Sequence, residues 1–346
     1  MKIWKQDCGA LTEAPWETIP ENIQSEILAA LPDEEGDYAP YMSEAHRLIA
    51  VTNRAWQDAE LLLYSPTPDG GCVLEGSGLS TLEHIVVPTH SPTGQPYTEV
   101  EQMAFFMDDT VKSITFLGSV TIHSMAFNAC SALEAVTVCG SIAASEEQAF
   151  CESPSLCSFT AWDAAVTLGD QVFADCPSLT RFQANRIDAM EDSAFSGCTS
   201  LETFTAIMNI RQIPSHAFAE CTALTAIQLP EGLTEIGWCA FEGCASLSAI
   251  HLPEGLNTIG DSAFYDCTAL TDIVVPHSVT HIGDSAFGHC RSLTHFKVPH
   301  GVARDTLLDD EDIRRFTDFW TLYSPDGWSS QNTDGYAAVE FIKLDT

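Results

Sequence analysis

Apolar positions recur with a fixed period over most of this chain. A phenylalanine returns every 22 or 23 residues, and a cysteine follows most of these phenylalanines three positions later. The phenylalanines are Phe105, Phe127, Phe150, Phe173, Phe195, Phe218, Phe241, Phe264 and Phe287, and alanine precedes all of them except Phe173. A fixed period of roughly 20–50 residues is the signature of repeats that stack on one another. The pattern therefore predicts a solenoid and favours binding over catalysis.

Residues 217–237 show the repeat unit most clearly. Ile227 and Leu229 alternate with Ala226 and Gln228, which predicts a short strand with the first pair inward and the second pair outward. A Pro-Glu-Gly turn and a second short extended segment follow, and the next Ala-Phe-x-x-Cys is predicted to form a short helical or 3₁₀ turn. One unit cannot bury its own apolar face, so neighbouring units must stack.

We expect nine to ten such units between residues 71 and 300. A polar insertion at about residues 89–100 predicts a surface loop after the first strand. Three central units replace the usual Ile-x-Leu by a larger and a smaller residue, which conserves core volume and predicts a change of twist or curvature near residues 155–206. These are Phe159-x-Ala161, Phe182-x-Ala184 and Phe204-x-Ala206.

The pattern A-F-x-x-C-x-x-L-x-x-I-x-L-P-x-x-L-x-x-I-G closely resembles the BspA-like class of leucine-rich repeats over about residues 73–300. The resemblance implies a right-handed, gently curved leucine-rich-repeat solenoid with a ladder of β strands on one face. It also implies binding of proteins or surface ligands without enzymatic activity, often as a cell-surface adhesin.

The segment before the repeats, residues 1–70, does not share their period. Apolar residues at helical spacing predict one helix near residues 23–31 and a second helical stretch over residues 48–63. A cluster of proline and glycine at residues 65–71 then breaks the chain before the repeats. We therefore expect a small α-helical N-terminal domain or cap.

This N-terminal segment resembles an F-box in Ile19-Pro20-Glu21, in residues 23–32 and in residues 48–56. The resemblance implies docking on an adaptor of a ubiquitin ligase, while the repeats hold a client protein. It implies that the adaptor contact is formed or supported by Pro20, Ile27, Leu28, Val51 and Trp56. The alternative is a helical cap that shields the open edge of the first repeat.

The last segment, residues 301–346, is predicted to cap the other end of the array. Residues 305–319 have the pattern of an amphipathic helix and residues 336–344 that of a strand, so we expect a mixed α+β cap. A cap is needed because the last repeat otherwise exposes apolar surface and unpaired strand edges.

The chain is strongly acidic, with 49 acidic and 14 basic residues and a formal net charge of −35. Residues 71–300 alone carry 26 acidic and six basic residues. Such a surface repels nucleic acid and anionic membranes. Either a solvated surface that resists aggregation or a footprint for a basic partner accounts for this charge.

Most of the 13 cysteines occupy one repeat position, which predicts a buried column of thiols and a reducing compartment. Pairing of Cys151 with Cys157, or of Cys239 with Cys244, stays open because spacing does not give geometry. The N-terminus shows no apolar secretion signal, and no stretch is long enough to span a membrane. We therefore expect a cytoplasmic or nuclear protein.

The sequence shows no phosphate loop, no nucleophile elbow and no zinc-protease motif. The cysteine column offers one ligand per repeat, unlike the close ligand pairs of structural zinc sites. We therefore expect no catalytic residues, no metal and no cofactor. The histidines near the end of the array are interpreted as solvated, with a metal or pH-sensing cluster as the alternative; they are His277, His281, His289, His295 and His300.

The outward positions of the strand ladder form a mostly polar face that predicts a docking platform for a protein partner. The alternative is that outward strand positions simply favour threonine, as at Thr115, Thr137 and Thr160. The candidate partner-binding residues are Arg181, Gln183, Thr203, Thr205, Gln228, His251, Asp272, His295 and Lys297. Together these features predict a non-enzymatic protein-interaction scaffold. Its leading form is an F-box-type substrate receptor, and the alternative is a cell-surface or structural adhesion or assembly protein.

Overall fold

The computed structural model describes most of the repeat region and parts of both ends. Its described residues are 2–7, 10–13, 17, 19, 21, 24–25, 27, 41–43, 48–51, 62–77, 82–91, 93–299 and 336–340. The chain divides into two compact units, which are described separately below. Unit 1 is Met1–Asp188 with Thr205–Ile207, and unit 2 is Ala189–Phe204 with Met208–Thr346.

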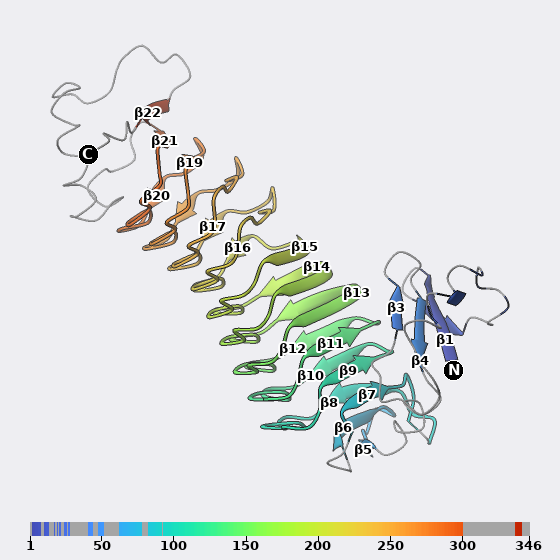
Figure 1. Cartoon of the computed structure of the whole chain (residues 1–346). Helices are drawn as coiled ribbons and strands as arrows, with labels where there is room; N and C mark the ends of the chain where they lie inside the picture. The colour runs from blue at the N-terminus through green and yellow to red at the C-terminus, as the bar shows by residue number, and fades with distance from the viewer. Residues whose placement is uncertain are drawn as a thin grey trace. The chain divides into compact units, whose positions relative to one another are not determined.

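Unit 1 begins with a small antiparallel sheet (Figure 1). The strand order is β2-β1-β4-β3, with bounds β1 Lys2–Asp7, β2 Ala10–Glu13, β3 Tyr41–Ser43 and β4 Leu48–Val51. Helical backbone occurs at Glu21, Gln24, Ser25 and Ile27. The second predicted helix, over residues 48–63, is wrong at both ends, because β4 occupies its start and β5 (Leu62–Pro66) begins within its last two residues.

The repeats of unit 1 stack as two ladders of parallel strands. The first ladder holds β7 (His84–Val87), β9 (Ser113–Phe116) and β11 (Ala135–Val138), and the second holds β6 (Cys72–Ser77), β8 (Tyr97–Val100), β10 (Val120–Ile122) and β12 (Ile142–Ser145). The long strand β13 (Ser158–Leu168) pairs with β11 through its first half and with β12 through its second half. Each repeat therefore contributes backbone to both ladders.

The predicted insertion at residues 89–100 is only partly a loop. Its last four residues form β8, which takes its place in the second ladder between β6 and β10. The proline-glycine cluster after residue 65 is the turn of a hairpin in which β5 pairs antiparallel with β6. β5 is the edge strand of this sheet.

The repeats that carry Phe-x-Ala differ from their neighbours in strand length. β13 and β14 (Arg181–Met190) run through the position where other repeats turn, and β15 (Thr203–Met208) pairs with β14. The Phe159 and Phe182 rings are fully buried and stack 5.3 Å apart. The volume-conserving exchange is confirmed as core packing at these two positions, and the change of curvature stays a prediction.

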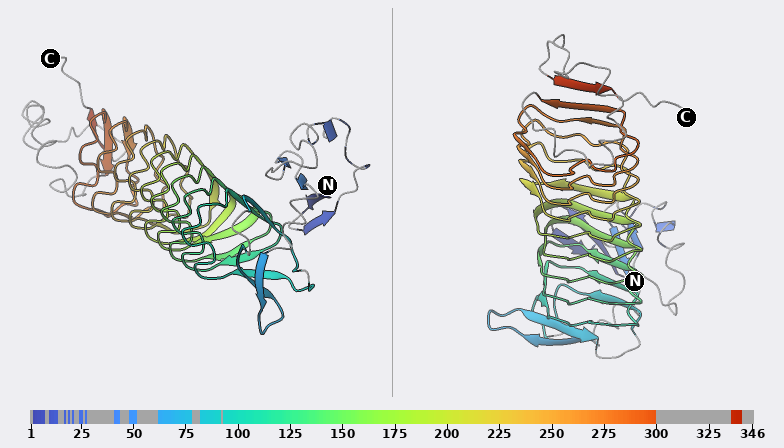
Figure 2. Two further views of the ribbon diagram at one scale, coloured as in Figure 1. Left: turned by 60° about the horizontal axis from the view of Figure 1, so that its bottom comes forward. Right: turned by 90° about the vertical axis from the view of Figure 1, so that its left-hand side faces the viewer.

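The shortest described strands lie in unit 2. A four-stranded parallel ladder contains only two-residue strands, in the order β16 (Gln212–Ile213), β17 (Glu235–Ile236), β18 (Thr258–Ile259) and β20 (His281–Ile282). On another side β19 (Asp272–Val274) pairs in parallel with β21 (His295–Pro299), and β22 (Tyr336–Glu340) pairs antiparallel with β21. Figure 2 shows these strands stacked turn upon turn. The predicted C-terminal strand is confirmed at residues 336–340, and the predicted helix at 305–319 lies outside the described residues.

The core of each unit is a stack of phenylalanine rings. Consecutive rings from Phe105 to Phe173 in unit 1 lie 4.9–5.2 Å apart, with interplanar angles of 8° or less. The rings from Phe195 to Phe287 in unit 2 lie 5.2–5.4 Å apart at angles of 6° or less. None of the nine rings is more than 3% exposed. The predicted solenoid core is confirmed.

The Ala-Phe segment between the ladders is neither helical nor 3₁₀, contrary to the sequence-based prediction. In the Phe218 repeat, His216 and Glu220 both have left-handed backbone, with φ of 54° and 60°. These left-handed residues let backbone amides of the turn point along the stack toward the next repeat. The Phe218 amide donates to the Ala240 carbonyl of that repeat at 2.8 Å. The turn is therefore stabilised by its neighbours, and no helix forms within it.

Candidate protein-binding face

The ladder to which β19 and β21 belong has no strand between residues 209 and 271, whereas the ladder of β16, β17, β18 and β20 runs through this part of unit 2. Residues 226–229, the clearest strand of the sequence pattern, do not form a strand. Their side chains alternate as predicted, since Ile227 and Leu229 are 8% and 7% exposed while Ala226 and Gln228 are exposed. The inward and outward prediction is thus confirmed, and the strand prediction is wrong at this repeat.

The missing strands leave backbone polar groups without ladder partners. Among the described residues, no hydrogen bond joins the backbone of residues 226–229 to that of residues 249–252. The next repeat keeps a single bridge, between Ala249 and Asp272. Backbone amides and carbonyls without a partner in the ladder remain available for other hydrogen bonds.

A groove lies over this interruption, with a cavity volume of about 340 Å³. The half-buried ring of Phe204 forms one wall and packs edge-on against Phe195 and Phe218, at centroid distances of 5.4 and 5.1 Å. The other lining residues are Ala226, Ile227, Gln228, Leu229, Glu231 and His251. An apolar floor with a polar rim is the usual composition of a protein-binding surface.

The structure supports the predicted outward orientation of the candidate binding residues wherever it describes their side chains. Arg181 and Thr205 of unit 1 are exposed and Gln183 is half-buried. In unit 2 the exposed residues are Thr203, Gln228, His251 and Asp272. The backbones of His295 and Lys297 belong to β21, and their side chains lie outside the described part.

Only two of these candidates, Gln228 and His251, line one groove together. The sequence did not single out Phe204 or Glu231 as binding residues, although the unusual Phe204-x-Ala206 pair marked this repeat as different. The outward face is also not open throughout unit 1. Thr115, expected to continue the exposed face, is 2% exposed.

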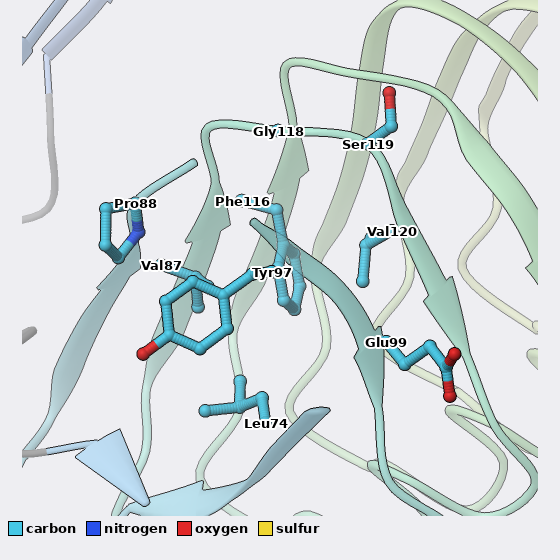
Figure 3. A pocket seen from close by; sticks show the side chains of 9 residues that line it. All are labelled: Leu74, Val87, Pro88, Tyr97, Glu99, Phe116, Gly118, Ser119 and Val120. Atoms are coloured by element: carbon cyan, nitrogen blue, oxygen red, sulfur yellow. The ribbon is translucent and has the colours of Figure 1, made fainter. Parts of the chain in front are cut away.

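A second hollow, in unit 1, is too small for a ligand. It is lined by nine residues including Tyr97, Glu99 and Phe116 (Figure 3) and has a volume of about 10 Å³, near the space of one water molecule. The Tyr97 hydroxyl is buried and has no hydrogen-bond partner among the residues that the structure describes, and burial raises the pKa of this phenol. A buried, protonated phenol beside so small a space gives no binding site.

The adaptor-binding residues implied by the F-box resemblance are only partly described. Pro20, Leu28 and Trp56 lie outside the described residues, and the side chain of Ile27 is fully buried. Val51 is the last residue of β4, where it pairs with Lys2 of β1. The helix that the resemblance requires here is therefore replaced by a strand.

The described cysteines, at the predicted column and elsewhere, are free thiols, and all but Cys157 are buried. Neither Cys151 with Cys157 nor Cys239 with Cys244 forms a disulfide. No helix of the described part has the length and apolar character to cross a lipid bilayer.

Comparison with known proteins agrees with this architecture. The BspA type leucine-rich repeat region matches in six copies, over residues 98–222 and 188–304. Comparison with curated proteins gives no significant match.

Several solved structures resemble the chain. A leucine-rich repeat protein of T. pallidum is 22% identical, with 74% of this chain and 94% of that chain covered and a TM-score of 0.38. A leucine-rich cell surface protein of Faecalibacterium prausnitzii is 19% identical, with 68% and 86% covered and a TM-score of 0.30. The pneumococcal vaccine antigen PcpA is 17% identical, with 67% and 64% covered and a TM-score of 0.37. Since the repeat matches span more than half of the sequence, this chain belongs to the BspA-type leucine-rich repeat family.

Proposed function

We propose that this chain is a non-enzymatic protein-interaction scaffold that binds an extended segment of a partner protein in the groove between Phe204 and His251. The observation that carries this proposal is the coincidence of the groove with the interruption of the strand ladder. The groove supplies apolar contact at Phe204, Ile227 and Leu229. The backbone of residues 226–229 supplies hydrogen-bonding groups that its neighbour does not use.

The charge of the face indicates the kind of partner. Glu231 lines the groove, Glu202 and Glu254 are exposed in the same repeats, and Asp272 is exposed in the repeat that follows. Residues 71–300 have 20 more acidic than basic residues, from the counts of 26 and six. Complementary charge mainly speeds encounter and suppresses wrong partners, so the partner segment carries lysine or arginine beside its apolar anchors.

Of the two biological settings expected from the sequence, we propose the cell-surface or assembly protein. The F-box setting requires a helix leading to Trp56, and the segment that begins it, Leu48–Val51, is a strand of an antiparallel sheet. The Faecalibacterium prausnitzii protein named above is described as a cell surface protein, and this proposal puts the present chain in the same kind of setting.

A selection of random peptides displayed on phage tests the groove. The full chain is expected to enrich peptides that combine apolar and basic residues. Ala226→Arg places a long cation in the groove at an exposed position and is expected to weaken the enriched peptides by about tenfold or more, since tenfold corresponds to about 1.4 kcal/mol. Asn257→Arg is the matched control, because it adds the same charge at an exposed position outside the groove.

Failure of the selection to enrich any peptide over a blank surface would count against the groove. So would equal peptide affinity of the Ala226→Arg and Asn257→Arg proteins. The setting is tested separately by mixing the full chain with a purified ubiquitin-ligase adaptor. No co-elution is expected in size-exclusion chromatography, and a stable complex would overturn the surface or assembly setting in favour of the F-box.

A further inference from the structure

The turn edge of unit 2 brings three metal-ligating side chains together. His216 and Cys239 occupy the same position of successive repeats, two residues before Phe218 and Phe241. Both have left-handed backbone, with φ of 54° and 52°. Equal backbone conformations in stacked turns point the two side chains in the same direction, one above the other.

Contact between side chains of this column is a property of the fold. In unit 1 the same position is held by Gln148 and Gln171 in successive repeats, and their side-chain amides form a hydrogen bond of 2.8 Å. The column therefore brings neighbouring side chains within direct contact. In unit 2 the same column places the imidazole of His216 next to the thiol of Cys239.

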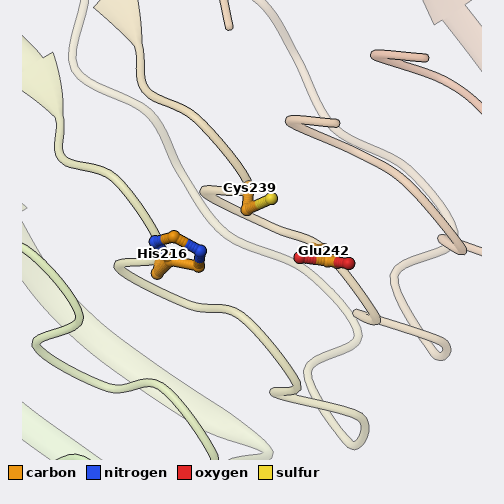
Figure 4. A group of neighbouring side chains, drawn as sticks. All are labelled: His216, Cys239 and Glu242. Atoms are coloured by element: carbon orange, nitrogen blue, oxygen red, sulfur yellow. The ribbon is translucent and has the colours of Figure 1, made fainter. Parts of the chain in front are cut away.

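A carboxylate completes the cluster. Glu242 follows Phe241 in the same turn as Cys239, and the ligand atoms of His216, Cys239 and Glu242 all lie within 4.8 Å of one another (Figure 4). Cys239 is 5% exposed, while the other two side chains are half-buried.

The backbone holds the three groups in place. The His216 amide donates to the Trp238 carbonyl at 2.8 Å, and the Cys239 amide donates to the Asp261 carbonyl at 2.9 Å. The Trp238 ring packs edge-on against the His216 ring at 4.4 Å, although 55% of this tryptophan is exposed. A metal site needs ligands whose orientation is fixed by their surroundings.

We propose that His216, Cys239 and Glu242 form a binding site for a divalent transition metal of the zinc class. Imidazole, thiolate and carboxylate are the three ligand types that zinc uses, in tetrahedral geometry, and three protein ligands leave the fourth position to water. A thiolate disfavours calcium and magnesium, which take oxygen ligands. On binding, Cys239 gives up its proton to solvent and becomes a thiolate.

This site differs from the one that the sequence excluded. The column of cysteines three residues after most of the phenylalanines is buried in the core and supplies at most one ligand per repeat. His216 and Cys239 belong to another column, where the ligands are 23 residues apart in sequence and adjacent only in the stack. Ligand-spacing rules for short motifs therefore miss it.

Titration of the full reduced chain with Co²⁺ tests the proposal. A 1:1 complex is expected, with a thiolate-to-cobalt charge-transfer band in the near ultraviolet, and Zn²⁺ is expected to abolish the band. Three variants are expected to lose it: His216→Gln, Cys239→Ser and Glu242→Gln. The fold accommodates the first two, because glutamine and serine occupy the same column at Gln148, Gln171, Ser262 and Ser285.

The control variants are Cys157→Ser, which removes the exposed thiol, and His251→Ala, which removes an exposed histidine elsewhere in unit 2. Both are expected to keep the band. Zinc is also expected to raise the midpoint of thermal unfolding of the parent and not of Cys239→Ser. The proposal is overturned if the parent shows no charge-transfer band at saturating cobalt, or if Cys239→Ser retains it.

Discussion

The thiol of Cys244 donates a hydrogen bond to the backbone carbonyl of Phe218 in the preceding repeat, with Sγ 3.2 Å from the oxygen. The same bond recurs along both stacks. It joins Cys130 to Phe105 and Cys176 to Phe150 in unit 1, and Cys221 to Phe195, Cys267 to Phe241 and Cys290 to Phe264 in unit 2. Where serine replaces cysteine, the Ser153 hydroxyl donates to the Phe127 carbonyl at 2.9 Å. The side chains at this repeat position therefore act as buried hydrogen-bond donors and do not only fill space in the apolar core.

Cys244→Ala is therefore expected to destabilise the protein more than Cys244→Ser. Alanine loses the hydrogen bond, worth about 0.5–1.5 kcal/mol, together with the packing of the sulfur. Serine keeps a donor, as it does in the fully buried Ser153. Urea unfolding of the two variants measures the difference, and equal free energies of unfolding would show that the donor has no role.

The thiols of the buried column, three residues after the phenylalanines, should be chemically inert in the native protein. Burial raises the pKa of the Cys176 thiol to about 12, and the thiolate is the reactive form. Among the described cysteines, iodoacetamide is expected to label the exposed Cys157, and to label Cys176 only after unfolding. Mass spectrometry of digested protein locates the label, and rapid native labelling of Cys176 would contradict the buried position.

The period of the phenylalanines was enough to predict the stack, because a buried ring in every turn leaves few ways to pack the chain. It was not enough to predict the turn, since the left-handed residues at His216 and Glu220 are not glycine and carry no local signal. The prediction of a strand at residues 226–229 was wrong for a different reason. Alternation reports which side of a residue is buried, while strand pairing depends on the distance to the neighbouring repeat.

The ends and the groove show where local pattern misleads. Residues 48–51 have helical spacing but pair with β1, so tertiary contact overrides the local preference. The groove was half predicted, because the outward positions of Gln228 and His251 follow from alternation. Phe204 lines the groove beside residues 226–229, which form no strand, and a single sequence does not show that the strand is missing.

Phe241→Ala is expected to destabilise the protein by about 3–5 kcal/mol, the cost of deleting a buried aromatic side chain. The Phe241 ring stacks on Phe218 and Phe264 at 5.4 and 5.3 Å, so its loss leaves a cavity between two rings. Phe106→Ala is the control, because Phe106 is 41% exposed. Denaturant unfolding that does not distinguish the two variants would show that the stack does not stabilise the fold.

Gly243→Ala is expected to destabilise the protein, and Gly232→Ala is not. Gly243 has a φ of 70°, and an added Cβ would lie 2.7 Å from the Glu220 carboxylate. Left-handed backbone alone costs a residue with a side chain about 1–2 kcal/mol. Gly232 has no atom near its Cβ position and no positive φ, so alanine there is neutral or stabilising by up to about 1 kcal/mol. Thermal unfolding midpoints that fall equally in both variants would contradict this assignment.

The His123 side chain contacts carboxylates of the repeats before and after its own in unit 1, and it should make the stability of the protein depend on pH. Its Nε2 lies 3.0 Å from a carboxylate oxygen of Glu99, and its Nδ1 lies 3.2 Å from one of Glu146. Burial alone would lower the pKa of His123, but hydrogen bonds to the two carboxylates outweigh it and raise the pKa above 6.5. Although burial by itself would raise the pKa of Glu146, its hydrogen bond with His123 leads the opposing contributions, and the pKa falls below 4.5.

A raised histidine pKa stabilises the fold fully below the unfolded value of 6.5, and this contribution is lost as pH rises through the folded pKa. The Glu146 contribution is present above 4.5 and is lost as pH falls through its folded pKa. The difference in unfolding free energy between the parent and His123→Gln should thus be largest between these two values. Urea unfolding of both proteins at about pH 5.5 and about pH 8.5, on either side of the ordinary histidine pKa, measures this difference. A difference that does not shrink at the higher pH would mean that the imidazolium is not what joins Glu99 to Glu146.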